Sequence, residues 1–428
     1  MNEFYLKQIE NLNNENVNER LKSLSILAKG IKKGEIKEPT QGSDVNNHIH
    51  TWYSFSPYSP TKAVWMAYTN GLTTAGIMDH DTLAGTKEFI KAGEIIGIAT
   101  TIGLELRVSM AQTPFNNVRI NNPDQNSIIY MAMHGIPHSQ IDTIQKYIKP
   151  YGEYRNIRNE QMVAKLNNIL KPYDIAINFK NDVLPLSKWD EGGSVTERHI
   201  SYALAYKLVN KFSKGEKLVD FYKNTMGLSL PSKMEKLLLD KDNMVYEYDL
   251  LGAIKSNMID KFYIEATKEC PDVKEALAIC KKTGAISAYA YLGDVGLSVT
   301  GDKKPQRFED AFIDELVKYL KTLGFNAITY MPSRNTMKQL NKIKMLCDSY
   351  GLFQISGEDI NSPRQKFICD AMRNTMFSNL VDSTWALIGH EKQGSLNINY
   401  GMFSENVVEE MPKLYDRIKL YKKMGLSK

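Results

Sequence analysis

The chain has 428 residues, 43% of them hydrophobic, and a formal net charge of +5 at pH 7. This length allows one large α/β domain with an insertion, or two to three domains. No apolar run approaches the ~20 residues of a membrane-spanning helix, and the mild charge without a Lys/Arg-rich tract argues against long nucleic acid as a ligand. Four cysteines without CxxC spacing suit a reducing compartment. We therefore expect a cytoplasmic protein that is not bound to a membrane.

The first segment, residues 1–40, predicts a helical arm. Leu21, Leu24 and Leu27 recur at helical spacing, and Gly30 would end the helix. The residue types of this segment do not indicate a catalytic or binding role. We expect it to serve packing or oligomer contact.

The next segment, residues 45–51, predicts a strand with two histidines separated by one residue. Because a strand projects alternate side chains to the same side, His48 and His50 would share one face and form a pair of metal ligands. For this short motif alone, an equally good alternative is two histidines that fall on a polar strand by chance or hydrogen-bond inside a core.

Two helix–strand units follow, in which a glycine ends the helix and a short apolar strand comes next. The strands, 72–78 and 98–104, lead directly to four polar residues: Asp79, His80, Asp81 and Glu105. Similar glycine–strand units recur late in the chain, and Asp359 follows the last of them. This alternation is typical of a β/α barrel or a doubly wound sheet. Because the carboxyl ends of barrel strands converge on one face, we predict a metal site there, formed by His48, His50, His80, Glu105 and Asp359.

Three segments resemble, in order and spacing, the opening motifs of the PHP (polymerase and histidinol phosphatase) family of metal-dependent phosphoesterases. They are residues 47–51, with the sequence NHIHT, residues 71–85, which end in MDHDTLAG, and residues 103–105, GLE. The resemblance implies that family's α/β fold, a distorted seven-stranded barrel, here with a mainly helical insertion. It also implies metal-dependent hydrolysis of phosphate esters.

Weaker similarity covers most of residues 44–365. His134 resembles the histidine that follows the glutamate motif in this family. Residues 155–166 and 198–200 are similar to segments of relatives that dephosphorylate nucleotides, and residues 356–361 are similar to the closing Ser-Asp-x-His motif.

The chain departs from the family's pattern at three positions. Ser-Phe-Ser at residues 54–56 stands where Ser-Asp-Gly is usual, Ala-Tyr-Leu at 290–292 replaces Ala-His-Pro, and Asn361 replaces the final histidine. Neither tyrosine nor asparagine is a strong nitrogen ligand. The changes therefore favour one or two ions over three.

The resemblance implies one to three divalent ions held by seven residues: His48, His50, His80, Glu105, His134, His199 and Asp359. Glu105 would bridge two ions, the second of which would take His134 and His199. From the residues alone, His199 is more readily a structural histidine in the first turns of a helix that begins with a capping box at residues 194–197. Mixed nitrogen and oxygen ligands suit Mn, Zn or Fe better than Mg or Ca.

The predicted catalytic residues are His80, Asp81 and Glu105. Asp81 would assist as a partner of a metal ligand or as a proton carrier. It could equally be a cap at the start of the next helix.

Residues 135–283 interrupt the barrel pattern with amphipathic helices and predict a lid over the barrel mouth. Three arginines are candidates for substrate binding: Arg155, Arg158 and Arg364. We expect the barrel itself to comprise residues 41–134 and 284–400, and a closing helix to occupy residues 401–428.

Together these patterns predict a cytoplasmic hydrolase that cleaves a phosphomonoester or phosphodiester of a small or nucleotide-like molecule through metal-activated water. One alternative is a degenerate PHP domain that binds metal or a phosphorylated ligand without turnover. A second is a metal-dependent hydrolase of carbon–nitrogen bonds. The sequence leaves the oligomeric state open.

Overall fold

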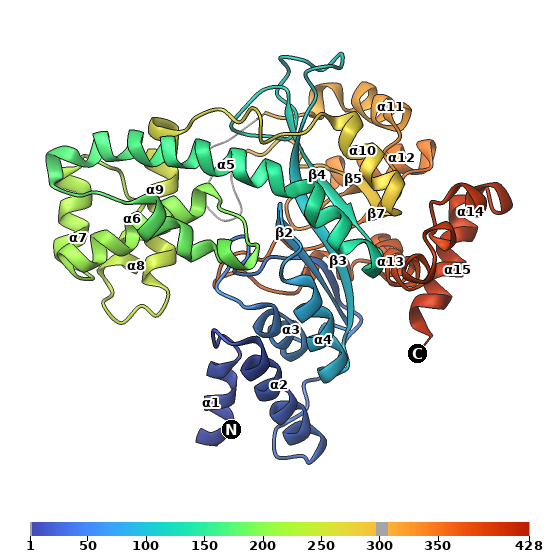
Figure 1. Ribbon diagram of the computed structural model, residues 1–428, viewed down its shortest axis with the longest axis horizontal. Helices are drawn as coiled ribbons and strands as arrows, with labels where there is room; N and C mark the ends of the chain where they lie inside the picture. Colours follow the sequence, from blue (N-terminus) through green and yellow to red (C-terminus); the bar gives the residue numbers. More distant parts are fainter. Residues whose placement is uncertain (1, 297–306, 428) are drawn as a thin grey trace.

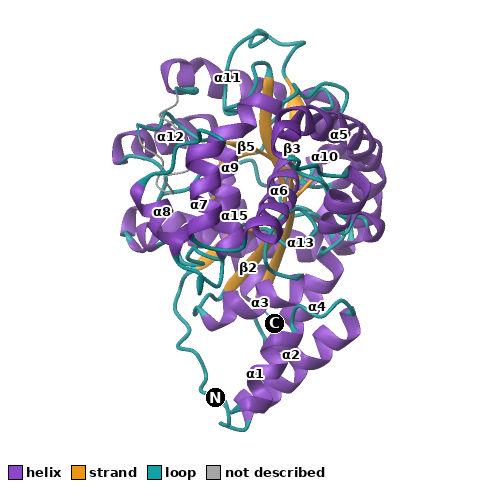
Figure 2. Cartoon of the chain, turned by 90° about the vertical axis from the view of Figure 1, so that its left-hand side faces the viewer, coloured by secondary structure: helices purple, strands orange, loops and turns teal. Residues whose placement is uncertain are grey.

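The computed structural model describes residues 2–296 and 307–427. Within them, seven strands form one sheet in sequence order (Figure 1). The strands are β1 (Val45–Ile49), β2 (Thr74–His80), β3 (Ala99–Ser109), β4 (Ile128–His134), β5 (Ile286–Ala290), β6 (Ala327–Thr329) and β7 (Phe353–Ile355). The sheet curls and is surrounded by helices (Figure 2), which confirms the predicted distorted seven-stranded barrel.

The two edges of the curled sheet meet at one residue pair. Ile49 at the end of β1 forms a parallel bridge with Ile360, which follows β7. The backbone N–H of His50 donates to the carbonyl oxygen of Ile360 at 2.9 Å, and the N–H of Ile360 donates to the carbonyl oxygen of His48 at 3.0 Å. The segment after β7 therefore lies directly beside the strand that carries both histidines.

Strand β4 departs from the predicted parallel alternation, because it runs antiparallel to both β3 and β5. A parallel neighbour requires a crossover connection, usually a helix, whereas residues 110–127 form turns without a helix. The chain therefore returns in the opposite direction. His134, at the end of β4, pairs with Gly103 rather than lying at the end of a parallel strand.

Six helices cover the outside of the sheet in the part of the chain that is described. They are α3 (Pro60–Thr69), α4 (Thr86–Ile96), α10 (Val273–Thr283), α11 (Ile313–Leu323), α12 (Met337–Tyr350) and α13 (Ser378–Leu396). The Ser59 side chain caps the start of α3, since it accepts a hydrogen bond from the Lys62 N–H. Gly97 and Gly351 end their helices at positive φ, a conformation that favours glycine.

The N-terminal arm consists of α1 (Glu3–Asn11) and α2 (Val17–Lys32), which lie at the lower end of Figure 1. Arg20 on α2 is fully buried, and its guanidinium forms two hydrogen bonds with the Glu88 carboxylate on α4, at 2.8 and 2.5 Å. The arm is therefore held against the barrel by a buried ion pair as well as by apolar packing.

The insertion projects to the left in Figure 1. It contains α5 (Ile141–Leu170), α6 (Glu197–Phe212), α7 (Glu216–Asp220), α8 (Ser232–Leu239) and α9 (Tyr246–Phe262). Its core is a separate apolar cluster drawn from residues 162–262. Within the predicted insertion of residues 135–283, α10 and the first turns of α5 pack into the barrel core.

The C-terminal segment forms two helices where one was predicted, α14 (Glu405–Glu410) and α15 (Leu414–Leu426). The break falls at Pro412, which lacks the N–H that a continuous helix needs. The backbone of α15 packs closely on α13, since a Cβ at Gly389 would lie 2.0 Å from the carbonyl oxygen of Tyr421. Among the described residues, no helix is both long and apolar enough to cross a membrane.

Candidate metal centre

The site begins with the bridge between β1 and the segment after β7. Ile49 and Ile360 are buried at 0% and 1% exposure. Because successive side chains of an extended chain point to opposite sides, their neighbours project together into the space at the barrel mouth. These neighbours are His48, His50, Asp359 and Asn361.

Asparagine and glycine residues hold these two segments in register. The Asn46 amide donates to the carbonyl oxygens of Glu358 and Phe367, and its oxygen accepts from the His48 N–H at 2.9 Å. A Cβ at Gly357 would lie 2.6 Å from the His48 nitrogen. Only glycine allows the backbone after β7 to approach β1 this closely.

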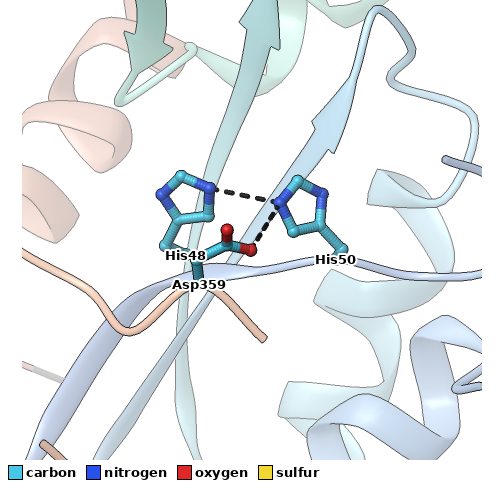
Figure 3. Close-up of side chains that lie close together, drawn as sticks. All are labelled: His48, His50 and Asp359. Carbon is cyan, nitrogen blue, oxygen red and sulfur yellow. Dashed lines mark hydrogen bonds and ion pairs between the residues drawn. The ribbon is translucent and has the colours of Figure 1, made fainter. Parts of the chain in front are cut away.

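The first ligand group consists of His48, His50 and Asp359 (Figure 3). The Nε2 atoms of the two histidines are 3.2 Å apart, and Asp359 Oδ1 lies 3.1 Å from His50 Nε2. A zinc–nitrogen bond of 2.0–2.1 Å in tetrahedral geometry would separate two ligand atoms by about 3.3 Å. The spacing of this group therefore fits ligands of a single ion.

The second ligand group consists of His50, His80 and Glu105. His80 and Glu105 are paired across β2 and β3, and His80 Nδ1 lies 3.1 Å from Glu105 Oε2. The same carboxylate oxygen is 3.8 Å from His48 Nε2. Glu105 thus lies between the two groups, as a carboxylate that bridges two ions would.

A chain of hydrogen bonds fixes the tautomer of His50. The Ser54 hydroxyl donates to the buried Asp79 carboxylate at 2.6 Å, so its oxygen is left to accept from His50 Nδ1–H at 3.2 Å. Asp79 is itself held by the N–H and the hydroxyl of Thr51, both at 2.6 Å. With its proton on Nδ1, neutral His50 presents a lone pair on Nε2, as metal-ligating histidines do.

The carboxylates of the site are held in their charged form. Burial opposes ionisation of Glu105, but His80, His48 and His50 together outweigh it and lower the pKa of Glu105 to about 2. Burial is likewise outweighed at Asp359, where the neighbouring His50 and His48 rings hold the pKa of the carboxyl well below its usual value. Burial lowers the pKa of His48 and so favours its neutral, metal-binding form.

His134 is buried, at 2% exposure. Burial and the nearby His48 lower its pKa to about 3, so the ring is neutral. Its Nε2 atom has no hydrogen-bond partner among the residues that the structure describes. Such an orphaned nitrogen close to His48 and Glu105 fits a metal ligand, although His134 lies outside the two compact groups.

His199 is arranged differently. Its Nδ1 accepts a hydrogen bond from the Thr196 N–H at 2.9 Å, which leaves the proton of the neutral ring on Nε2. The capping box of α6 is thus formed by Thr196 and His199 rather than at residues 194–197 as predicted. The Phe55 ring packs edge-on against His199 with centroids 5.0 Å apart. In this arrangement Nε2 offers a proton rather than a lone pair, and the ligand role of His199 stays a prediction.

Asp81 lies on the wall of the cavity, five residues before the start of α4, so it is not the cap of that helix. Its φ of +52° is unusual for a residue other than glycine. Its carboxylate forms an ion pair with Arg155 of α5. Asp81 therefore connects the end of β2 to the insertion.

The other two predicted substrate-binding arginines are also bound to carboxylates. Arg158 pairs with Glu197 at 2.6 Å and with Glu269, and Arg364 forms two 2.7 Å hydrogen bonds with Asp249. Neither lines the cavity at the ligand groups. Their role in substrate binding stays a prediction.

Sequence reasoning missed three arginines that line this cavity, Arg107, Arg198 and Arg334. Arg107 is two residues after Glu105 on β3, so strand alternation alone places it on the same face. Arg198 Nη1 donates to Asn361 Oδ1 at 2.6 Å. Its position next to His199, a predicted metal ligand, could have indicated that Arg198 lies near the site. Its contact with Asn361, however, depends on how the insertion folds.

The altered family positions have structural roles of their own. The Tyr291 hydroxyl donates to Asp310 Oδ1 at 2.7 Å, outside both ligand groups. Asn361 contacts Asp359 and Arg198 through its amide. Phe55 has a φ of +132° and packs among aromatic rings of the insertion, those of Tyr202 and Tyr248.

A cavity of about 570 Å³ extends from the ligand groups between the barrel and the insertion. The barrel contributes residues such as His80, Glu105 and Tyr291, and the insertion contributes others such as Asn257 and Tyr263. Cavities of this size accommodate small organic ligands. A molecule bound to the ligand groups would therefore contact both parts of the chain.

Comparisons with known proteins agree with this picture. The family model described as PHP domain matches residues 46–330. A 5′-3′ exoribonuclease from Haemophilus influenzae is 32% identical over 74 residues, 17% of this chain and 27% of the relative, so the chain spans about a quarter of the curated relative that it matches.

Two solved structures are similar in fold. A protein assigned as a metal-dependent phosphoesterase from Bifidobacterium adolescentis has 21% identity and a TM-score of 0.50, with 79% of this chain and 97% of that one covered. An amidohydrolase from Chromobacterium violaceum has 18% identity and a TM-score of 0.47 over 76% of this chain and 90% of that one. The first likeness shows the fold, and the second is too distant to support an argument.

Proposed function

This chain belongs to the PHP domain family, and from that premise we propose that it hydrolyses a phosphate ester of a small organic molecule in a metal-dependent reaction. The observation that carries the proposal is the joint presence of two ligand groups and an arginine on one cavity. Histidine and carboxylate ligands suit divalent Mn, Zn or Fe, and a guanidinium beside them suits an anionic substrate.

The donor set supports two ions. One imidazole nitrogen binds one ion, and His50 Nδ1 is already used by Ser54. We therefore assign His48, His50 and Asp359 to one ion, and His80 with Glu105 to the other. Glu105 can serve both, because a carboxylate has two oxygens. His134 is a further candidate for the ion beside Glu105.

Ions bound at these residues supply Lewis acidity and an activated water molecule. The chain's own residues then bind and orient the ester. Arg198 faces the cavity beside Asp359 and would bind a phosphate oxygen. Arg107 lines the same cavity. However, Glu197 and Glu269 lie 3.4 and 3.6 Å from its guanidinium, and their negative charges offset its attraction for an anionic ligand.

Asp81 would act by positioning rather than as a free base. Its ion pair with Arg155 is buried, with side-chain exposures of 8% and 4%, and this pairing keeps the carboxylate directed toward the insertion. We propose that the pair holds the insertion over the cavity. The insertion then limits the access of water to the bound ester.

The organic part of the substrate would extend into the remainder of the cavity. A phosphate group alone does not fill about 570 Å³, and the walls away from the ligand groups include Tyr263, Met234 and Ile259. A small phosphorylated organic molecule, nucleotide-like in size, fits this mixture of charged and apolar walls.

The test is a hydrolysis screen with the purified protein in added Mn²⁺, covering phosphomonoesters, phosphodiesters, amides and cyclic ureas. Glu105→Gln serves as the inactive variant and Glu160→Gln, at an exposed position of α5, as its matched control. Release of phosphate or alcohol that is lost only in Glu105→Gln is the expected result. Turnover of amides alone would replace the proposal by carbon–nitrogen hydrolysis, and bound metal without turnover of any compound would indicate a binding domain.

A further inference from the structure

Asn361 forms hydrogen bonds with both its amide oxygen and its amide nitrogen. The oxygen accepts from Arg198 Nη1 at 2.6 Å, and the nitrogen donates to Asp359 Oδ1, also at 2.6 Å. Since a guanidinium only donates and a carboxylate only accepts, these partners determine which end of the amide faces which. Asp359 Oδ1 is the same atom that lies 3.1 Å from His50 Nε2.

The backbone around Asn361 is held independently of its side chain. Gln365 accepts from the Asn361 N–H at 2.7 Å and donates to the Asp359 carbonyl oxygen at 2.6 Å. Ile360 between them is fixed by the bridge to β1. Asn361 is 5% exposed. The amide is therefore a rigid connection between the ligand segment and the insertion.

Arg198 differs from the other arginines around the cavity. Arg107 and Arg155 each have a carboxylate within 4 Å. Arg334 donates a hydrogen bond to the carbonyl oxygen of Leu292 at 3.1 Å. In residues 2–296 and 307–427, no carboxylate oxygen lies at ion-pair distance from Arg198, whose hydrogen-bond partner is the neutral Asn361 amide. The guanidinium is thus held in place while its charge is left available to the cavity.

We propose that Asn361 is a positioning residue that orients two groups at once, the metal ligand Asp359 and the anion-binding Arg198. An aspartate at this position would neutralise Arg198 and repel Asp359, and an apolar side chain would hold neither. The amide alone among these choices donates to one partner and accepts from the other. This inference rests on the proposed function in that Arg198 is taken to bind the phosphate group.

If Asn361 orients both groups, its loss should have two distinct effects, one on metal binding and one on phosphate binding. Loss of the bond to Asp359 should weaken metal binding, because partners of metal ligands typically contribute about 10- to 100-fold in affinity. Loss of the bond to Arg198 should weaken phosphate binding, but only while Arg198 is present. A double-mutant cycle detects this dependence.

The experiment measures Mn²⁺ affinity of the metal-free protein and inorganic phosphate affinity of the Mn²⁺-loaded protein by calorimetry. The variants are Asn361→Ala, Arg198→Ala and their combination. Asn224→Ala, at an exposed asparagine of the insertion, is the matched control, and thermal unfolding checks each fold. We expect Asn361→Ala to bind Mn²⁺ about tenfold more weakly, with Arg198→Ala unchanged in Mn²⁺ affinity.

For phosphate, each single variant should lose about tenfold in affinity, and the double variant should lose no more than Arg198→Ala alone. Mn²⁺ and phosphate affinities of Asn361→Ala within twofold of the wild type would overturn the inference, as would additive losses in the double variant. If the variants give the expected affinities but the wild type hydrolyses no ester, the inference stands and the proposed hydrolysis is refuted. A wild type that binds neither Mn²⁺ nor phosphate would overturn both.

Discussion

Ile49 and Ile360 pair through their backbones where the two edges of the curled sheet meet. Neither side chain has any polar group, and both are buried. Their pairing nevertheless creates the site, because it places the side chains on either side of each isoleucine on one face. The candidate metal centre is therefore a consequence of how the barrel closes, and variants that disturb the closure should affect metal binding.

Gly357→Ala tests this dependence. The added Cβ would lie 2.6 Å from the backbone nitrogen of His48, so the segment after β7 must shift away from β1. We expect a loss of about 1–3 kcal/mol in the free energy of unfolding, together with weaker Mn²⁺ binding. Urea denaturation and calorimetry measure the two effects. Gly252→Ala is the control for stability, because its Cβ would meet no atom closer than 3.9 Å. Unchanged Mn²⁺ affinity in Gly357→Ala would contradict the link between closure and metal binding.

Ser54→Ala tests the orientation of His50. The substitution removes the hydroxyl between Asp79 and His50 Nδ1, so the imidazole is free to adopt either tautomer. We expect Mn²⁺ affinity to fall by about tenfold or more while the protein stays folded. Ser56→Ala is the matched control, because the Ser56 hydroxyl is buried without a hydrogen-bond partner in the described structure. Equal Mn²⁺ affinities of the two variants would refute the orienting role.

Arg20→Met tests how the N-terminal arm is held. Removal of one partner from a buried ion pair leaves the Glu88 charge uncompensated, which costs about 3–5 kcal/mol. Urea denaturation should show a loss of this size. Lys22→Met breaks only the exposed contact with Glu19 at 3.6 Å and should cost at most about 1 kcal/mol. Similar losses in both variants would mean that the Arg20 pair contributes no more than an exposed one.

Glu309 predicts a pH dependence of stability. Burial raises the pKa of its carboxyl from 4.5 to about 7, so the folded chain retains a proton that the unfolded chain releases. The stability due to this group is complete below pH 4.5 and is lost as the pH rises through 7. The full effect is about 3 kcal/mol. Urea denaturation at pH 5 and pH 8 should show a smaller decrease for Glu309→Gln than for the wild type.

Glu315→Gln is the control for that comparison, because Glu315 is exposed on α11. This substitution should leave the decrease in stability between pH 5 and pH 8 as it is in the wild type. An equal decrease from pH 5 to pH 8 in Glu309→Gln and the wild type would contradict the assignment.

The repeated glycine–strand units predicted a β/α barrel or a doubly wound sheet, the family resemblance selected the barrel, and both ligand groups consist of residues that the sequence indicated. Strand alternation placed His48 and His50 on one face, and the ends of parallel strands brought His80 and Glu105 near them. These relationships depend on local periodicity and on parallel pairing, both of which are visible in a single sequence. Asp359 was also predicted this way, because it follows the last of the repeated glycine–strand units.

Other features depend on contacts between distant segments. The reversed direction of β4 follows from the absence of a helix in residues 110–127, which the apolar pattern of β4 does not reveal. The partners of Arg155 and Arg158 come from three different segments, and the bond between Arg198 and Asn361 spans 163 positions. Sequence patterns identified Arg155 and Arg158 as candidates but not Arg198, and only the fold distinguishes the ion-paired arginines from Arg198.

The most direct test of the account is the metal content of the purified protein after saturation with Mn²⁺, measured by elemental analysis beside His50→Ala and His138→Ala. His138 is a suitable control because its side chain is 40% exposed and contacts Glu391 rather than the ligand groups. The account predicts two ions per chain in the wild type and in His138→Ala, and one or none in a folded His50→Ala. Wild-type metal content in His50→Ala would contradict the metal centre on which the proposed hydrolysis depends.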